Sequence, residues 1–462
     1  MNKNLFLTLS AFLFLFPLSG KATGTYRPET SVAGFIQLPG SGRQVYDFNP
    51  GWRFFKGDIS GAETVNFDDC SWEVVSTPHT VELMPAEASG CRNYQGPVWY
   101  RKHFVVPAET KGQRVSIHFE AAMGKQILYL NGKRIQEHIG GYLPFTLDLT
   151  TYGVQAGDSC LLAVFVDNSD DKSYPPGKRQ YTLDFTYHGG IYRDVWMIAK
   201  SPISITDAIE SQTVAGGGVF VHFDQISEKS AQVCVNTEVQ NENTRSESVI
   251  VETTLTDADG KIIRRISGKL SLQSGEKKII RQQMEVKNPK LWSPDTPYLY
   301  RVQSRLKKGN QSIDGGITRV GIRLAEFRGK DGFWLNGTPF GQLVGANRHQ
   351  DFAYVGNALP NSQQWRDAKR LRDAGCTIIR TAHYPQDPSF MDACDELGLF
   401  VIVATPGWQY WNKDLQFGEL VHRNTREMIR RDRNHPSVLM WEPILNETRY
   451  PLDFALKALD IT

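Results

Sequence analysis

Short apolar and aromatic runs recur through the first part of the chain, and in several of them every second residue is polar. Runs of this kind, rich in β-branched and aromatic residues, are typical of β-strands. Asn131-Gly132 between two runs is a strong hairpin signal. No long helical period intervenes, so residues 43–200 are predicted to form a jelly-roll β-sandwich. The runs lie at residues 52–55, 98–106, 114–119, 126–130, 161–166 and 195–198.

A second group of short strands follows at an even spacing. Asp257, Asp259 and Gly260 mark a turn within it. The spacing predicts an immunoglobulin-like β-sandwich over residues 201–325. Few polar side chains are expected to converge there, so we assign this domain a structural role. Its strands are predicted at residues 219–223, 232–236, 248–255 and 299–302.

From residue 326 the pattern changes to alternating buried strands and amphipathic helices, after a hairpin at residues 333–340. Ser362 is the predicted cap of the first helix and Gly375 its stop. Four strand–helix alternations predict a parallel sheet, and hence the N-terminal half of a (β/α)₈ barrel over residues 326–462. Strands are predicted at 343–346, 376–379, 399–403 and 438–441, and helices at 362–374, 390–397, 417–431 and 453–459.

Length and charge exclude some classes of protein. A chain of 462 residues predicts two to four domains. The net charge of +2 gives no reason to expect a nucleic-acid partner. The six cysteines match no zinc or CxxC spacing, and Cys70–Cys91 is the one pair that we consider for a disulfide.

The N-terminus is typical of a cleavable secretory signal. Lys3 precedes an apolar run at residues 5–18, and Gly20-Lys21-Ala22 supplies small residues at its end. We place the cleavage after Ala22, which leaves residues 23–42 as a lead segment. Because the apolar run is short for a bilayer, we expect a periplasmic or secreted protein without a membrane span.

Each of the four predicted barrel strands ends in polar side chains. The carboxyl ends of barrel strands meet at one face, where such folds carry their chemistry. A single polar residue at the end of a strand is most simply explained as a structural group. Polar residues at the ends of four successive strands, all on the same face of the barrel, indicate an active site. The residues are Arg348 and His349, then Arg380, His383 and Tyr384, then Trp408 and Gln409, and finally Asn446 and Glu447.

These motifs resemble glycoside hydrolase family 2, the family of β-galactosidases, β-glucuronidases and β-mannosidases. Residues 380–385 match its second-strand signature, and residues 432–437 with Asn446-Glu447 match its acid/base signature. Weaker matches lie at 189–195, at 291–300 and at 347–349. The resemblance covers the whole mature chain.

The resemblance implies an exo-acting, retaining β-glycosidase, similar to β-galactosidases, that hydrolyses terminal β-linked sugars of oligo- and polysaccharides. This chemistry needs two carboxyl groups about 5 Å apart. Glu447 matches the proton donor, and Asn446 matches the residue that holds the 2-hydroxyl of the sugar. The other implied substrate-binding residues are Arg380, which orients the nucleophile, His349, His383, Trp408 and Asp184, with Tyr187 as a weaker candidate.

Some positions depart from the family pattern. The loop before Glu447 is one residue longer than usual and carries Glu442, which is therefore a rival proton donor. Gln350 and Ala404-Thr405 stand where many members have acidic residues. Since magnesium prefers carboxylate oxygens, we expect neither a magnesium site nor another cofactor.

In the family that the sequence resembles, the nucleophile is a Glu on a later barrel strand, which comes after the four strands predicted in this sequence. We therefore expect this chain to be an incomplete and inactive part of a larger enzyme. Whether the full-length protein forms a homo-oligomer stays open. The alternative is a non-catalytic carbohydrate-binding protein, in which two sandwiches carry a vestigial barrel.

Overall fold

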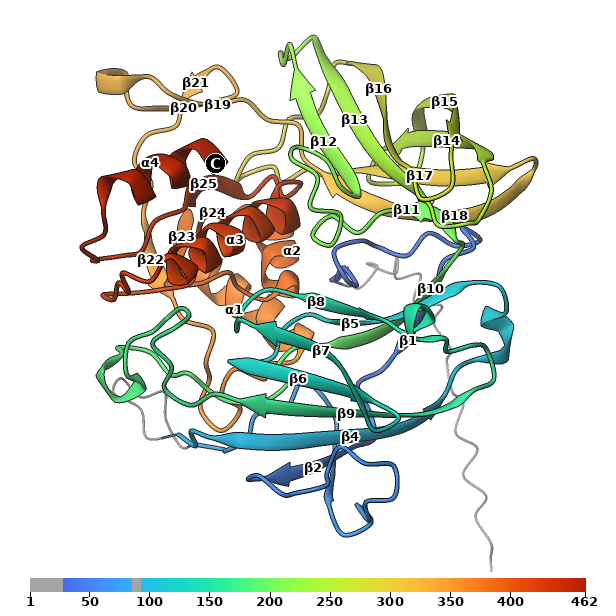
Figure 1. The fold of residues 1–462 in the computed structure, drawn as a ribbon. Helices are drawn as coiled ribbons and strands as arrows, with labels where there is room; N and C mark the ends of the chain where they lie inside the picture. The colour runs from blue at the N-terminus through green and yellow to red at the C-terminus, as the bar shows by residue number, and fades with distance from the viewer. Residues whose placement is uncertain (1–27, 85–92) are drawn as a thin grey trace, which may run out of the picture.

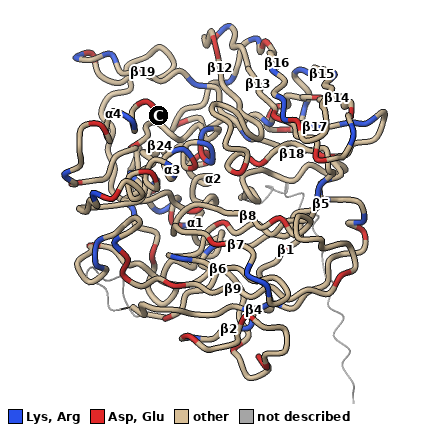
Figure 2. The backbone as a smooth tube through the Cα atoms, viewed as in Figure 1, with Lys and Arg blue, Asp and Glu red and all other residues tan. Residues whose placement is uncertain are grey.

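The computed structural model describes residues 28–84 and 93–462, and it arranges them as two β-sandwiches beside a half-barrel (Figure 1). The predicted signal and Cys91 lie outside the described residues, so the structure does not test the cleavage site or the Cys70–Cys91 pair. None of the helices in the described part of the chain is long and apolar enough to span a membrane. Figure 2 shows that both signs of charge occur on each of the three parts.

The first sandwich packs a six-stranded sheet, in the order β3-β2-β4-β9-β6-β7, against a four-stranded sheet, in the order β1-β10-β5-β8. Its core is built on buried aromatic residues such as Trp52 and Phe119. Asn131 and Gly132 have φ angles of 50° and 81° between β6 and β7, as the hairpin signal predicts. The jelly-roll prediction is confirmed. The strands are β1 (Gln44–Asp47), β2 (Trp52–Lys56), β3 (Glu73–Val75), β4 (Pro97–Val105), β5 (Arg114–Phe119), β6 (Lys125–Leu130), β7 (Lys133–Ile139), β8 (Phe145–Asp148), β9 (Ser159–Asp167) and β10 (Val195–Lys200).

The second sandwich joins one sheet in which β13 pairs β11, β12 and β16 to another in the order β15-β14-β17-β18. The amide of Gly260 donates to the carbonyl of Asp257 over 3.1 Å, which forms the predicted turn. The immunoglobulin-like prediction is confirmed, although the sequence patterns did not single out β11, β15, β16 or β18. The strands are β11 (Ile203–Ile205), β12 (Val219–Asp224), β13 (Ser230–Asn241), β14 (Glu247–Thr256), β15 (Ile262–Leu272), β16 (Lys277–Lys287), β17 (Tyr300–Lys308) and β18 (Gln311–Val320).

The third part holds a small antiparallel sheet and a four-stranded parallel sheet in the order β22-β23-β24-β25. These four strands and their helices confirm the half-barrel. The exact domain bounds remain predictions. The elements are β19 (Ala325–Phe327), β20 (Phe333–Leu335), β21 (Thr338–Pro339), β22 (Gly345–Arg348), α1 (Asn361–Asp373), β23 (Ile378–Thr381), α2 (Pro388–Leu397), β24 (Phe400–Ala404), α3 (Leu415–Asp432), β25 (Val438–Glu442) and α4 (Leu452–Ile461), and four short 3₁₀ turns at Ala108–Thr110, Thr150–Tyr152, Gln180–Thr182 and Gly329–Asp331 complete the fold.

Two local predictions in the half-barrel are wrong. Strand β22 begins two residues later than predicted, because Val344 is bound by Thr377 in the turn before β23. Its first three residues are exposed, since β22 is an edge strand among the described residues. Helix α1 begins at Asn361 after Pro360, whose ring fixes φ, and so Ser362 lies inside the first turn and caps nothing.

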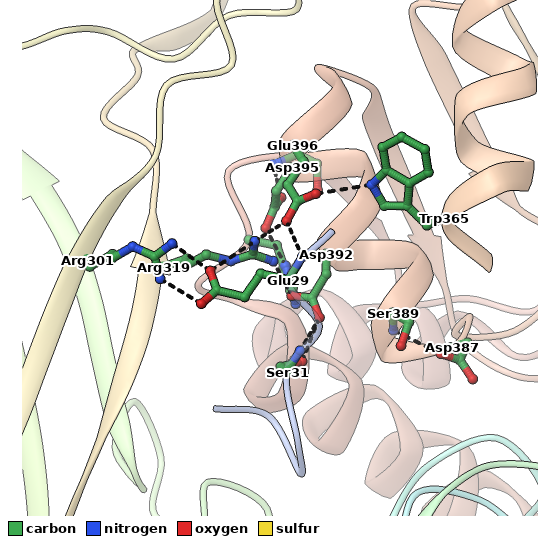
Figure 3. A network of polar contacts seen from close by, with 12 residues as sticks. Glu29, Ser31, Arg301, Arg319, Trp365, Asp387, Ser389, Asp392, Asp395 and Glu396 are labelled. Atoms are coloured by element: carbon green, nitrogen blue, oxygen red, sulfur yellow. Dashed lines mark hydrogen bonds and ion pairs between the residues drawn. The ribbon is translucent and has the colours of Figure 1, made fainter. Parts of the chain in front are cut away.

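A network of ion pairs fastens the lead segment between the second sandwich and the half-barrel (Figure 3). Arg319 on β18 pairs with Asp392 over 2.9 Å and also contacts Glu396, both on α2. Glu29 accepts a hydrogen bond of 2.9 Å from Arg301 on β17, and the amide of Ser31 donates to Asp392 over 2.7 Å. We call Glu29, Arg301, Arg319, Asp392 and Glu396 the junction. It fixes where α2, and hence the parallel sheet, lies against the second sandwich.

Candidate active site

The residues that follow the four parallel strands meet at the carboxyl end of the sheet. His349 and His383 follow β22 and β23, and their ring centroids are 5.7 Å apart. Trp408, after β24, forms a parallel bridge with Asn446, after β25, and the amide of Gln409 donates to the carbonyl of Asn446 over 3.0 Å. The predicted strand-end residues His349, His383, Trp408, Gln409 and Asn446 thus lie together, with His383 stacked on Trp408, whereas Arg348 is buried and pairs with Asp367 on α1.

The first sandwich contributes an aromatic side chain to this group. Phe185 is buried and stacks on the His349 ring at a centroid distance of 5.3 Å. It also meets the rings of His383 and Trp408 at 6.0 and 6.4 Å. The sequence analysis did not single out Phe185, because nothing in its pattern separates it from an ordinary core aromatic. Its neighbours Asp184 and Tyr187 were the residues of this segment that the sequence analysis named.

Asp184, His349 and His383 bring one ligand atom each to within 4.8 Å of one another. Burial, and then the charges of Arg380 and His349, lower the pKa of His383 to about 3, and burial lowers the pKa of His349 as well. Both imidazoles are therefore neutral near pH 7. A carboxylate beside two neutral imidazoles can bind sugar hydroxyl groups, and the same donor set could hold a cation.

Arg380 forms a two-pronged ion pair with Glu442, in which Nε and Oε2 are 2.7 Å apart. Both carboxylate oxygens of Glu442 accept hydrogen bonds from Arg380. This contact argues against Glu442 as a proton donor and instead assigns it the role of holding Arg380 in place. A weaker contact of 3.4 Å joins Arg380 to Asn347.

Glu447 is exposed and connects to the rest of the group through Gln409. The Gln409 amide nitrogen donates to Oε2 of Glu447 over 2.5 Å, and the amide oxygen accepts from Nζ of Lys178 over 2.6 Å. Lys178, from the loop after β9, places its ammonium 3.7 Å from the centroid of the Trp408 ring. Burial lowers the pKa of Lys178, and the nearby charges of Asp184 and Glu447 oppose this shift.

The position of Lys178 bears on the predicted role of Trp408. The ammonium covers one part of the indole, and the His383 ring lies parallel to it at a centroid distance of 6.0 Å. A sugar that stacks on the face covered by Lys178 would have to displace this lysine. Lys178 is a residue that sequence reasoning missed, since it belongs to a loop of another domain.

The loop that carries Lys178 is seated directly on the loop after β24. Asn412 donates to the carbonyl of Lys172 over 2.8 Å. Gly177 has a φ of 69°, and a Cβ atom at this position would lie 2.3 Å from the Tyr410 ring. Glycine is therefore required here both for its backbone conformation and for the close approach.

Tyr187 is buried in a cluster that also contains Phe185 and Trp408, and its hydroxyl has no hydrogen-bond partner among the described residues, so its contact with substrate stays a prediction. Gln350 is buried and accepts a hydrogen bond of 2.9 Å from Arg193. Ala404 offers no side-chain ligand. Gln350 and Ala404 therefore do not fit a magnesium site of the family type.

Three family models match the chain in succession. The "Glycosyl hydrolases family 2, sugar binding domain" matches residues 57–202, "Glycosyl hydrolases family 2" matches residues 217–323, and the "Glycosyl hydrolases family 2, TIM barrel domain" matches residues 327–460. The chain belongs to glycosyl hydrolase family 2. The resemblance seen in the sequence motifs is confirmed.

Relatives in family 2 carry two activities in their names. A β-galactosidase of Thermoanaerobacter pseudethanolicus is 36% identical over 414 residues, which is 89% of this chain and 53% of that protein. A β-glucuronidase of Formosa agariphila is 31% identical over 424 residues, which is 88% of this chain and 42% of that protein.

Solved structures agree with this assignment. The structure of Bacteroides uniformis β-glucuronidase 2, covalently bound to cyclophellitol-6-carboxylate aziridine, has a TM-score of 0.80 and 30% identity, and covers 91% of this chain and 50% of that one. A β-glucuronidase from glycoside hydrolase family 2 has a TM-score of 0.84 and 29% identity, with coverages of 92% and 45%. This family 2 chain spans about half the length of the relatives that it matches.

Proposed function

We propose that this chain carries the acid/base half of the active site of an exo-acting, retaining β-glycosidase that removes terminal β-linked sugars. The observation that supports the proposal best is the hydrogen bond of 2.5 Å from Gln409 to Glu447, which ties the candidate donor to the strand ends. The relatives named β-galactosidase and β-glucuronidase support the same reaction class. The partner is then a carbohydrate, and the predicted signal favours a periplasmic or secreted location.

The roles of the site residues follow from their contacts. Glu447 protonates the leaving oxygen, and Asn446 beside it holds the 2-hydroxyl of the sugar. The neutral rings of His349 and His383, with Asp184, bind further hydroxyl groups. Arg380 is held by Glu442, which keeps its guanidinium at the carboxyl end of the sheet, where it can orient the attacking carboxylate.

We also propose that the attacking carboxylate is not among these 462 residues. Glu442, the acid at the end of β25, has both carboxylate oxygens hydrogen-bonded to Arg380, so neither oxygen is free for the attack. The 462-residue chain alone is then inactive on aryl β-glycosides. Turnover by the purified chain that disappears in Glu447→Gln would contradict this proposal and would still support the assigned donor.

The experiment that tests the function uses the longest natural protein that contains these residues. A panel of aryl β-galactosides and β-glucuronides is assayed with the wild type and with Glu447→Gln. We expect the variant to lose about 10²–10⁴-fold in kcat/KM on poor leaving groups and to retain most activity on activated ones, since these need no proton. Equal losses on all leaving groups would rule out Glu447 as the donor.

The matched control is Glu442→Gln, because this variant also removes one carboxylate at the end of β25. We expect it to slow the hydrolysis of all leaving groups alike, since Arg380 loses its partner. If no variant and no substrate shows turnover while the protein still binds sugars, the carbohydrate-binding alternative is favoured.

A further inference from the structure

Three metal-ligating side chains gather on the second sandwich, far along the chain from the strand-end residues. His222 and Asp224 belong to β12, and Cys234 belongs to β13. In the antiparallel register His222 faces Cys234 directly, and Asp224 faces the next residue on the same side, Gln232. One ligand atom from each of the three lies within 4.8 Å of the others.

The pleat of the sheet explains why these side chains share a face. Val221, Val233 and Val235 are buried in the core of the sandwich. Because successive side chains alternate between the two faces, His222, Asp224 and Cys234 point away from that core. Facing residues on antiparallel strands have Cβ atoms about 5 Å apart, which allows a thiol and an imidazole to meet on one ion.

The hydrogen bonding of this group is incomplete. The thiol of Cys234 contacts Oδ2 of Asp224 at 3.3 Å. Nδ1 of His222 is buried and has no hydrogen-bond partner among the described residues. A buried polar nitrogen without a partner destabilises the fold, and an ion held by this nitrogen together with the other two side chains would remove that penalty.

A second cluster of the same size, Asp392, Asp395 and His435, serves as a comparison. Here the protein itself supplies the partners. Asp392 is paired with Arg319 over 2.9 Å, and Asp395 accepts from His435 over 2.6 Å and from the amide of Ser437 over 3.0 Å. The side chains of this cluster have hydrogen-bond and ion-pair partners within the protein, so it is a structural network. In the cluster on the second sandwich, Nδ1 of His222 lacks such a partner among the described residues.

We propose that His222, Asp224 and Cys234 form a binding site for a thiophilic divalent transition-metal ion of the zinc class. A thiolate, an imidazole and a carboxylate are the ligands that zinc prefers, and water completes the tetrahedron. Magnesium and calcium are excluded, since they take oxygen ligands. On binding, the thiol proton is released to solvent and the ion joins the thiolate, which ties β12 to β13. The site is independent of the proposed glycosidase activity.

Cobalt(II) is the probe for the test, because a thiolate ligand gives it a strong charge-transfer absorption. The metal-free purified protein is titrated with cobalt and then with zinc. We expect one equivalent of cobalt to produce the thiolate band, and zinc to abolish it and to raise the melting temperature, while magnesium does neither.

The variants locate the site. Cys234→Ser should lose the band, and Asp224→Asn, at an exposed position that tolerates substitution, should weaken cobalt binding about tenfold or more with an unchanged far-ultraviolet spectrum. The matched control, Cys376→Ser, removes a partly exposed thiol of the half-barrel and should keep the band. Absence of the band in the wild type, or a band that Asp224→Asn leaves unchanged, overturns the proposal.

Discussion

The junction and the strand-end site both gather polar and charged side chains at buried places of the half-barrel, but the two groups differ in how these side chains are paired. At the junction, Asp392 and Glu396 meet the guanidinium of Arg319, whose side chain is 6% exposed. At the site, His383 is neutral and its Nδ1 is buried without a hydrogen-bond partner among the described residues. The comparison shows that both acids of α2 are paired at the junction, whereas His383 at the site keeps a buried nitrogen that is free to bind another molecule.

The largest effect is expected from breaking the junction. Arg319→Met leaves Asp392 and Glu396 in a buried place without their main counter-charge, so we expect the free energy of unfolding to fall by about 3–5 kcal/mol. Denaturant unfolding measures this change. The control is Arg328→Met, which removes an exposed pair with Glu326 and should cost less than about 1 kcal/mol. Equal effects of the two variants would show that the junction is not a buried network.

The next effect is a pH dependence from His435 near the junction. Burial alone would lower its pKa, but the charge of Asp395 and its hydrogen bond outweigh burial and raise the pKa to about 9. A raised pKa in the folded state stabilises the fold below the unfolded pKa of about 6.5, and this contribution disappears as the pH rises to about 9. We expect wild type to lose about 3 kcal/mol relative to His435→Gln over this range. Denaturant unfolding at several pH values measures this change. If the free energy of unfolding has the same pH dependence in wild type and in His435→Gln, the raised pKa of His435 is contradicted.

His383 in the site should show the opposite sign. Burial, together with Arg380 and His349, lowers its pKa to about 3. Between that value and about 6.5 the unfolded chain binds a proton that the folded chain does not, so stability falls as the pH falls. Relative to His383→Gln, wild type should lose about 2 kcal/mol between pH 7 and pH 5, as measured by denaturant unfolding. A stability difference that stays constant over this range would refute a neutral, buried His383.

The smallest effect is expected where the first sandwich meets the site. Gly177→Ala places a methyl group against Tyr410 at a positive φ, and we expect a loss of about 1–2 kcal/mol in stability. Because this glycine precedes Lys178, the variant should also shift the lysine and Gln409, and in the longest natural protein that contains these residues it should lower kcat more than it changes KM. Gly153→Ala, at a φ of 82° but with no atom within 4 Å of the added methyl group, is the control for backbone strain alone.

The sequence predicted those parts of the site that lie within one repeating pattern. Asn446, Glu447, His349 and His383 each follow a strand of the half-barrel, and strand ends of a parallel sheet meet by topology. Phe185 and Lys178 come from the first sandwich, and their place in the site depends on how two domains pack. No local pattern of apolar and polar residues contains that information.

The same limit explains the remaining differences. The start of β22 depends on Val344 being bound to Thr377, a contact that periodicity does not show. Cys234 matched no zinc spacing because its two partner ligands lie on the neighbouring strand, and only the register of β12 and β13 brings them together. A site whose ligands lie on two strands depends on the register between those strands, and this register cannot be predicted from the local pattern of a single sequence.

The anchoring of Ser31 on Asp392 has a consequence for the order in which the protein is made. The two residues are 361 positions apart, so the docking surface for the lead segment exists only after most of the chain has been synthesised. Contacts of such long range form late and slowly, whereas the first sandwich can fold while the rest of the chain is still being synthesised. The lead segment is therefore expected to be among the last parts of the described chain to dock.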